Sequence, residues 1–374
     1  GGEKVEIRRK TIRLNDLVEG YVDKGNEGVE GLSGTLDIRP PYQREFVYGD
    51  DRQQAVVDSV ISGFPLGIMY WVDREDGTYE VLDGQQRILS ICNFHNRGFS
   101  LKHSGKPIYF DGMTSEEQEA FLSYELDVYV CSGTEREKLE WFERINVIGV
   151  PLTKQELRNA AYTGPWLSSA KSYFSKDKAA VDKYSNYLNG SKNRQEWLET
   201  AIEWKSHEEY GKLNIEQYMA DHQQDENADE LWKYFFRVMN WVESIFKKYR
   251  SLMKGIDWGI LYKEHWEQVR TLEPEEVEKE VSWLVQHPDV KVKKGIYEYV
   301  FDRDERHLNL RAFDQPTRIE IYEKQGGRCA MCGEEFELKD MHADHITPFS
   351  KGGLTVPENC MMLCAEDNWK KSNK

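Results

Sequence analysis

Four polar side chains near the C-terminus have the types and spacing that a metal-assisted hydrolysis needs. Asp344 and His345 are adjacent, and Asn359 and Asn368 follow them. A carboxylate oxygen suits Mg²⁺ or Mn²⁺, and an imidazole can take a proton from water near neutral pH. Asp344 is therefore a candidate metal ligand, His345 the candidate general base, and Asn368 a candidate second ligand through its amide oxygen. This set predicts attack of an activated water on a phosphodiester.

The stretch around these residues resembles the HNH endonuclease family. The resemblance covers about the last sixty residues, and it is carried by the four side chains just named and by a Gly-Gly turn between them. It implies a ββα-metal fold for residues 315–374 and cleavage of DNA. It also implies a part for Asn359 in catalysis, because this residue would tie the loop so that His345 points inward.

Cysteines frame the same stretch and predict a structural zinc site. Cys329 and Cys332 have the spacing of a zinc knuckle, and Cys364 is a third candidate ligand. The HNH pattern would place a fourth cysteine where this chain has Asp367. A carboxylate can ligate zinc, so a Cys₃Asp site is one interpretation. Otherwise Cys360 serves as the fourth ligand, or zinc is weakly bound or absent.

Two polar clusters near the N-terminus hold the candidate nucleotide- or DNA-sensing residues. In the second cluster, a strand is expected to end in Asp-Gly and to turn directly into a helix. Backbone N–H groups at a helix N-terminus favour an anion, and an arginine adds a forked donor for phosphate. Bracing of a loop is the alternative role for these side chains. The two clusters are Arg39, Tyr42, Gln43 and Arg44, and Asp83, Gly84, Gln85, Gln86 and Arg87.

These clusters resemble the ParB/sulfiredoxin-like domain family called domain-of-unknown-function family 262, which opens GmrSD-like restriction proteins. The string from Asp83 to Arg87 matches the family signature without gaps, and the resemblance spans roughly residues 8–165. It implies binding and hydrolysis of a nucleoside triphosphate (NTP), coupled to sensing of modified DNA. The chain has no Gly-rich loop of the Walker type, so hydrolysis would use the Asp-Gly-Gln-Gln-Arg pocket instead.

The patterns along the chain predict a multidomain α+β protein. Residues 1–165 alternate strands and helices and form the expected ParB-like α/β sensor or nucleotide domain. Residues 166–314 are expected to be a helical middle domain. Within it, apolar residues from Leu231 to Phe246 recur at three- and four-residue spacing and predict a packed helical core. Residues 315–374 form the expected HNH nuclease domain with its ββα-metal fold.

Composition restricts the class of protein. The chain has 374 residues, six cysteines and a net charge of −16. The cysteines concentrate near the C-terminus, which favours a metal site in a reducing cytoplasm over a disulfide framework. Lys and Arg contacts to phosphates normally dominate DNA affinity, so DNA contact by this acidic chain must be local, metal-assisted or gated. Without a long apolar run or a signal peptide, we expect a cytoplasmic protein with no membrane span, and a homo-oligomer is compatible with these features.

This combination predicts a modification-dependent, type IV-like anti-phage endonuclease. Its HNH domain would hydrolyse modified phage DNA with Mg²⁺ or Mn²⁺, gated by DNA sensing and by binding or hydrolysis of NTP in the N-terminal domain. The main alternative is a modified-DNA binding and NTP-switch protein whose nuclease domain is weak or silent. A nuclease that acts on RNA is a third hypothesis, because the metal-site residues do not separate the two substrates.

Overall fold

The computed structural model describes the chain over residues 5–41, 48–103, 105–145 and 152–372. Three predicted sensing residues, Tyr42, Gln43 and Arg44, lie outside the described residues. The chain forms two compact units. The first comprises residues 1–240 and 254–264, and the second comprises residues 241–253 and 265–374.

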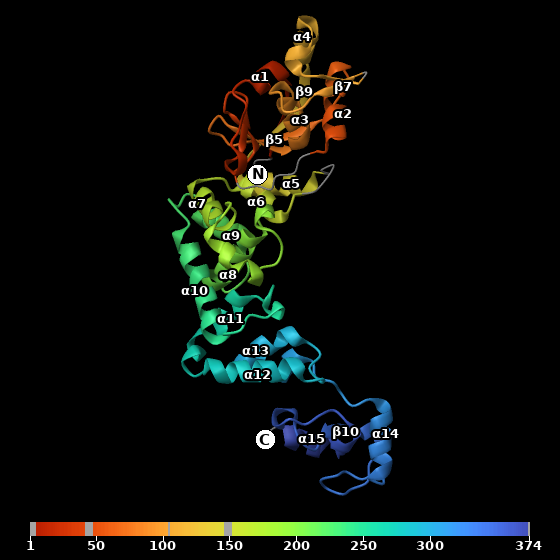
Figure 1. The fold of residues 1–374 in the computed structure, drawn as a ribbon. Helices are drawn as coiled ribbons and strands as arrows, with labels where there is room; N and C mark the ends of the chain where they lie inside the picture. Colours follow the sequence, from red (N-terminus) through yellow and green to blue (C-terminus); the bar gives the residue numbers. More distant parts are fainter. Residues whose placement is uncertain (1–4, 42–47, 104, 146–151, 373–374) are drawn as a thin grey trace. The chain divides into compact units, whose positions relative to one another are not determined.

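The N-terminal part of the first unit holds a seven-stranded mixed sheet, in the order β1-β9-β5-β6-β4-β3-β2; Figure 1 labels its strands β5 and β9. Strand β5 runs parallel to β9, and β4 runs parallel to β6, whereas the other neighbours are antiparallel. A separate two-stranded hairpin joins β7 to β8. The strands are β1 (Glu6–Arg13), β2 (Val22–Asp23), β3 (Val29–Gly31), β4 (Leu36–Arg39), β5 (Met69–Asp73), β6 (Tyr79–Asp83), β7 (Leu101–His103), β8 (Lys106–Ile108) and β9 (Glu125–Ser132).

Four helices share one apolar core with this sheet, and their bounds are α1 (Leu14–Val18), α2 (Asp50–Ile61), α3 (Gln85–His95) and α4 (Ser115–Ser123). Val57 of α2 and Ile88 of α3 are fully buried in this core, together with Trp71 and Val128 of the central strands. Burying such side chains is the main term that holds a helix on a sheet, at about 1.5–3 kcal/mol each. The predicted alternation of strands and helices is therefore confirmed.

The turn from β6 into α3 depends on Gly84. Its φ is +105°, which L side chains rarely adopt. A Cβ atom there would also lie 2.7 Å from Cγ of Met69. Glycine is thus required both by backbone conformation and by close approach, and the tight turn places α3 directly after the sheet.

Helices continue the chain beyond the sheet, as α5 (Glu135–Arg144), α6 (Lys154–Ala161), α7 (Pro165–Phe174), α8 (Glu196–Tyr210), α9 (Ile215–His222), α10 (Asp229–Ile245) and α11 (Trp258–His265). The predicted aromatic stripe lies on α10. Phe235 is fully buried and stacks on Trp204 with ring centroids 5.7 Å apart. Phe236 was expected in the same core but is 39% exposed. It follows Phe235 directly, and successive helical residues lie about 100° apart, so both cannot face the core.

The second unit ends in a β-hairpin followed by a helix. Its elements are α12 (Pro274–Gln286), α13 (Ile296–Asp302), α14 (Gln315–Lys324), β10 (Met341–His345), β11 (Cys360–Cys364) and α15 (Ala365–Ser372). The hairpin is antiparallel, with Met341 opposite Cys364 and His345 opposite Cys360. A small core that includes Ile321 of α14 lies against it. Among the described residues, no helix is long and apolar enough to cross a membrane.

Candidate functional site

The hairpin and α15 bring together the C-terminal residues that the sequence singles out. Asp344 and His345 end β10, and α15 contacts this strand. Asp344 accepts a hydrogen bond through Oδ1 from the His345 backbone N–H at 2.8 Å, and through Oδ2 from Lys371 Nζ at 2.7 Å. Lys371 also donates to the His345 carbonyl oxygen. Asn368 is half-buried three residues before Lys371, a spacing that places both on one side of the helix.

The His345 imidazole is held at one nitrogen and open at the other. Its Nε2 lies 2.8 Å from Oγ1 of Thr355, and the Thr355 hydroxyl donates to the Arg311 carbonyl oxygen at 3.1 Å. A hydroxyl has a single hydrogen, so when Thr355 donates it to Arg311, Nε2 is the donor to Thr355 and Nδ1 keeps its lone pair. Burial lowers the pKa of His345, against the opposing effect of Asp344. The neutral imidazole, which can accept a proton, is thereby favoured.

Asn359 closes the loop that follows His345. Its Oδ1 accepts from the Thr347 backbone N–H at 2.7 Å, and its Nδ2 donates to the carbonyl oxygens of Thr347 and Leu354 at 3.0 and 2.9 Å. A Cβ atom at Gly353 would lie 1.8 Å from the Thr347 carbonyl oxygen, so only glycine fits there. One side chain thus ties both ends of the loop and brings residue 355 to His345.

Removing the Asn359 amide is expected to loosen this loop. Asn359→Ala deletes three hydrogen bonds, each with a net contribution of about 0.5–1.5 kcal/mol. We expect cleavage of DNA to slow by about 10–100-fold, as for other residues that orient a catalytic group. The measurement is initial cleavage rate together with thermal unfolding. Asn240→Ala, on the exposed side of α10, is the matched control, and equal rates for the two variants would contradict the role of Asn359.

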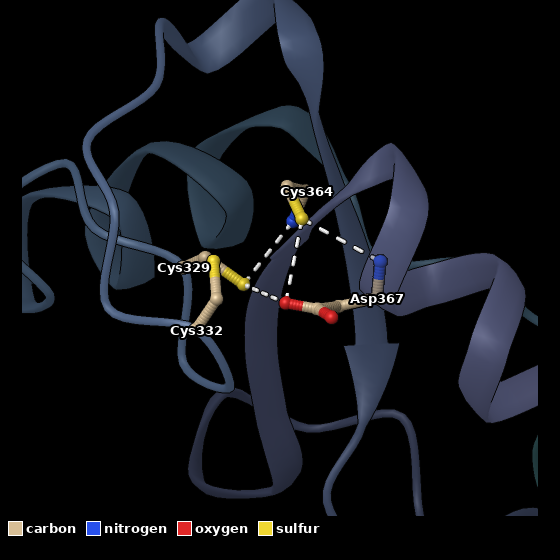
Figure 2. A group of neighbouring side chains, drawn as sticks. All are labelled: Cys329, Cys332, Cys364 and Asp367. Atoms are coloured by element: carbon tan, nitrogen blue, oxygen red, sulfur yellow. Dashed lines mark hydrogen bonds between the residues drawn. The ribbon is translucent and has the colours of Figure 1, made fainter.

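Three thiols and one carboxylate gather beside the hairpin (Figure 2), and their ligand atoms lie within 4.8 Å of one another. The thiols of Cys329 and Cys364 donate to Oδ2 of Asp367 at 3.2 and 3.4 Å. Cys332 completes the group. In a tetrahedral site with Zn–S of about 2.3 Å and Zn–O of about 2.0 Å, neighbouring ligand atoms lie about 3.5 Å apart. The four side chains therefore fit a zinc ion.

Backbone N–H groups also prepare Cys329 for a metal. The Cys364 N–H lies 3.4 Å from the Cys329 sulfur. Burial opposes the thiolate, but the N–H groups of Cys364, Cys332 and Met331 outweigh it and lower the pKa of Cys329. The local backbone therefore favours the thiolate, the form that binds metal, at Cys329.

The alternative ligand Cys360 lies at the other end of β11. It stands opposite His345, whereas Cys364 stands opposite Met341. Four residues of strand separate the two sulfur-bearing positions by about 13 Å. Burial raises the pKa of the Cys360 thiol to about 11. The distance separates Cys360 from the cluster, in which Asp367 is the fourth potential ligand.

A cavity of about 170 Å³ opens beside α2 and α3 in the first unit. Arg39 lines it and is 2% exposed. Its Nη2 donates to the Gly25 carbonyl oxygen at 3.0 Å, whereas its Nη1 is buried and finds no hydrogen-bond partner in the described part of the chain. An unpaired buried guanidinium nitrogen is costly unless a ligand satisfies it. The other lining residues are Tyr21, Asp23, Val29, Tyr48, Gln53, Gln86, Leu89, Ser90 and Asn93.

Some of the predicted sensing residues line this cavity, and others do not. Gln86 lines the cavity together with Arg39, and its Oε1 accepts from the Tyr48 backbone N–H. Gln85 instead donates to the Ile38 carbonyl oxygen at 3.0 Å. Neither Asp83 nor Gly84 lines the cavity as described.

The Arg87 guanidinium is hydrogen-bonded to other groups of the protein. It donates to the carbonyl oxygens of Leu66 and Ile68 at 2.6 and 3.3 Å, and to Asp83 Oδ2 at 3.3 Å. These contacts fix the segment before β5 to the start of α3. The lining amides Gln53 and Asn93 were missed by the sequence, because they belong to no motif and meet only when α2 packs on α3.

Two family models match the chain. The model of the GmrSD restriction endonuclease N-terminal domain matches residues 18–163, and the model of the HNH endonuclease matches residues 329–374. Both resemblances in the sequence are thereby confirmed. Neither the curated proteins nor the solved structures gave a match.

Proposed function

We propose that this chain, a GmrSD-type restriction endonuclease with an HNH nuclease domain, is a modification-dependent, type IV-like endonuclease that cuts modified phage DNA. The observation that carries the proposal is the His345 imidazole, which Thr355 holds through Nε2, directly after Asp344 in the chain. We assign the ParB/sulfiredoxin-like fold to residues 1–165, the helical middle to 166–314 and the ββα-metal fold to 315–374.

In the proposed reaction, His345 accepts a proton from water through Nδ1, and the resulting hydroxide attacks the phosphorus of a DNA phosphodiester. The bond from phosphorus to the 3′ oxygen breaks, and this oxygen leaves and takes a proton from solvent. Thr355 holds the opposite nitrogen, so the imidazole cannot rotate freely while the proton moves. A general base placed in this way contributes about 10²–10⁴-fold to the rate.

Asp344 and Asn368 are the residues that would hold Mg²⁺ or Mn²⁺. Their carboxylate and amide oxygens suit hard cations. The contact between Lys371 and Asp344 shows that this carboxylate already attracts positive charge. A bound metal ion would stabilise charge on the phosphate and on the leaving oxygen. Lys371 must then leave Asp344, and its ammonium becomes available for a neighbouring phosphate.

Arg39 supports a sensing role for the N-terminal cavity. An unsatisfied guanidinium nitrogen aimed at a polar cavity suits a phosphate or another ligand rich in acceptors. The rest of the lining includes the neutral amides of Gln53, Gln86 and Asn93, which offer donors as well as acceptors, and the carboxylate of Asp23, whose Oδ1 lies 3.6 Å from Arg39 Nη2. The cavity is therefore our site for NTP or for a part of modified DNA, and its occupancy would gate cleavage.

Arg39→Met is expected to remove the cavity's ligand contact while leaving the nuclease residues intact. Loss of charge-assisted hydrogen bonds worth about 1.5–3 kcal/mol predicts about 10–100-fold weaker NTP binding by titration calorimetry. Zinc content and thermal unfolding report on the fold. Arg97→Met is the control, because Arg97 is exposed and pairs with Asp111. Unchanged NTP affinity in a folded Arg39→Met protein would exclude this cavity as the NTP site.

A plating assay tests the proposed function in cells. Bacteria expressing the chain are challenged with a phage whose DNA carries a base modification and with a derivative that lacks it. The proposal expects fewer plaques only for the modified phage, and full plating when His345→Ala replaces the wild type. Equal plating of both phages on the wild type for every modification tried would count against modification-dependent restriction.

A further inference from the structure

Thr355 connects the candidate general base to a part of the chain outside the HNH match at residues 329–374. Its hydroxyl contacts His345 Nε2 at 2.8 Å, and its backbone N–H donates to Asp289 Oδ2 at 2.6 Å. Asp289 is 3% exposed. A buried carboxylate that accepts a short hydrogen bond is a strong and directional anchor. The position of Thr355 is therefore set by Asp289.

The same anchor orients the Thr355 hydroxyl. Arg311 donates its backbone N–H to the Asp289 carbonyl oxygen at 2.9 Å, and its own carbonyl oxygen receives the Thr355 hydroxyl at 3.1 Å. Asp289 also donates its N–H to His287 Nδ1 at 3.2 Å. While its hydrogen goes to Arg311, Thr355 can only accept from His345. The segment around residues 287–311 thus favours the tautomer in which Nδ1 keeps its lone pair.

A ring cluster fixes the loop between β10 and β11 to the same segment. Phe349 is 5% exposed and lies against His287, with ring centroids 4.8 Å apart, and against Trp283, with centroids 5.6 Å apart. Aromatic pairs of this kind contribute about 0.5–1.5 kcal/mol beyond the area they bury. The loop that holds Thr355 is therefore attached at two places, one polar and one apolar.

We propose that Thr355 and Asp289 are positioning residues for His345, so that the segment from α12 to residue 311 completes the nuclease centre. Neither residue touches the reacting atoms. Thr355 keeps Nδ1 of His345 free to accept a proton and fixes the orientation of the imidazole. Asp289 holds Thr355 in place. DNA cleavage would then require this segment to stay in contact with the loop between β10 and β11. The inference rests on the proposed role of His345 as general base.

Thr355→Val tests the proposal, because valine keeps the shape and the backbone N–H but removes the hydroxyl. We expect kcat for Mg²⁺-dependent cleavage of plasmid DNA to fall by about 10–100-fold, with KM changed by less than about threefold. Thr355→Ser restores the hydroxyl and is expected to recover most of kcat. Thr271→Val is the matched control, since the Thr271 hydroxyl also donates to a backbone carbonyl, that of Gln268 at 2.9 Å.

A spectroscopic readout separates positioning from general loss of structure. In ¹⁵N spectra of imidazole-labelled protein, wild-type His345 is expected to show the Nε2–H tautomer alone. Thr355→Val should give a mixture of both tautomers, whereas Thr271→Val should not. The melting temperature and zinc content of each variant are measured alongside. If Thr355→Val disturbs the fold, Asp289→Asn tests the proposal in its place. We expect kcat to fall by about 3–10-fold in this variant and to stay unchanged in its control, Asp340→Asn.

His345→Ala, measured in the same series, distinguishes two failures. If His345→Ala abolishes cleavage while folded Thr355→Val keeps wild-type kcat and a single tautomer, the positioning inference is overturned and the general base stands. If His345→Ala cleaves like the wild type, the proposed function itself fails.

Discussion

His345→Ala is expected to slow metal-dependent DNA cleavage by about 10²–10⁴-fold, the contribution of a positioned general base. The physical reason is that alanine removes the imidazole that contacts Thr355, while the backbone N–H that donates to Asp344 remains. Zinc content and melting temperature should stay near the wild-type values, because His345 is half-buried and lies outside the cysteine cluster. The measurement is single-turnover cleavage of plasmid DNA with Mg²⁺ or Mn²⁺.

His342→Ala supplies the matched control for this experiment. His342 lies on the same strand but is exposed, so its loss should leave the rate near that of the wild type. Equal and large losses in both variants would point to disturbance of β10 and not to removal of a base. Wild-type cleavage by His345→Ala would show that another group accepts the proton.

Removal of zinc is expected to have the largest effect on stability. Structural zinc contributes about 10–16 kcal/mol of apparent binding free energy in small domains. The cluster adjoins a small core in which Cys329, Cys364 and Met341 are buried, so the metal would connect residues that pack at its centre. Cys329→Ser, or treatment with a strong chelator, should therefore unfold the C-terminal hairpin and abolish cleavage. Metal analysis should find one zinc ion per chain in the wild type and none in the variant.

Cys360→Ala is the control for the cysteine replacement. Cys360 is buried in the same core but stands at the far end of β11, so its variant should keep zinc. Loss of zinc from Cys360→Ala with retention in Asp367→Ala would instead make Cys360 the fourth ligand. A wild-type protein that binds no zinc, yet folds and cleaves, would contradict the structural role of the cluster.

Local features of the sequence were enough to predict many residues of the candidate nuclease centre. Asp344 and His345 are adjacent, and a short hairpin followed by a helix is enough to return Lys371 to them. Cys329 and Cys364 lie far apart in sequence but retain the spacing that HNH proteins use. Strand alternation and turn glycines such as Gly84 are also local features, because each acts over a few residues. They predicted the alternation of strands and helices in residues 1–165.

Contacts between distant segments could not be predicted in this way. Asp289 meets Thr355 across 66 residues, and neither belongs to a motif. Arg87 shows a second limit. Its sequence context suggests a phosphate ligand, but its partners are the backbone carbonyls of Leu66 and Ile68, which leave no trace in residue type. Arg39, a predicted sensing residue, lines the polar cavity, but its unpaired nitrogen is visible only in three dimensions.

The central claim is that the HNH centre cuts DNA under control of the N-terminal domain. It is tested most directly by plasmid cleavage with purified protein, comparing phage-modified with unmodified DNA, with and without NTP, in Mg²⁺ or Mn²⁺, beside His345→Ala. We predict cutting of the modified DNA only, altered by NTP and absent from the variant. Equal cutting of both DNAs would contradict control by modification. Salt-dependent binding of modified DNA by wild type and variant alike, with no cutting under any condition, would contradict the nuclease and favour a binding and NTP-switch protein.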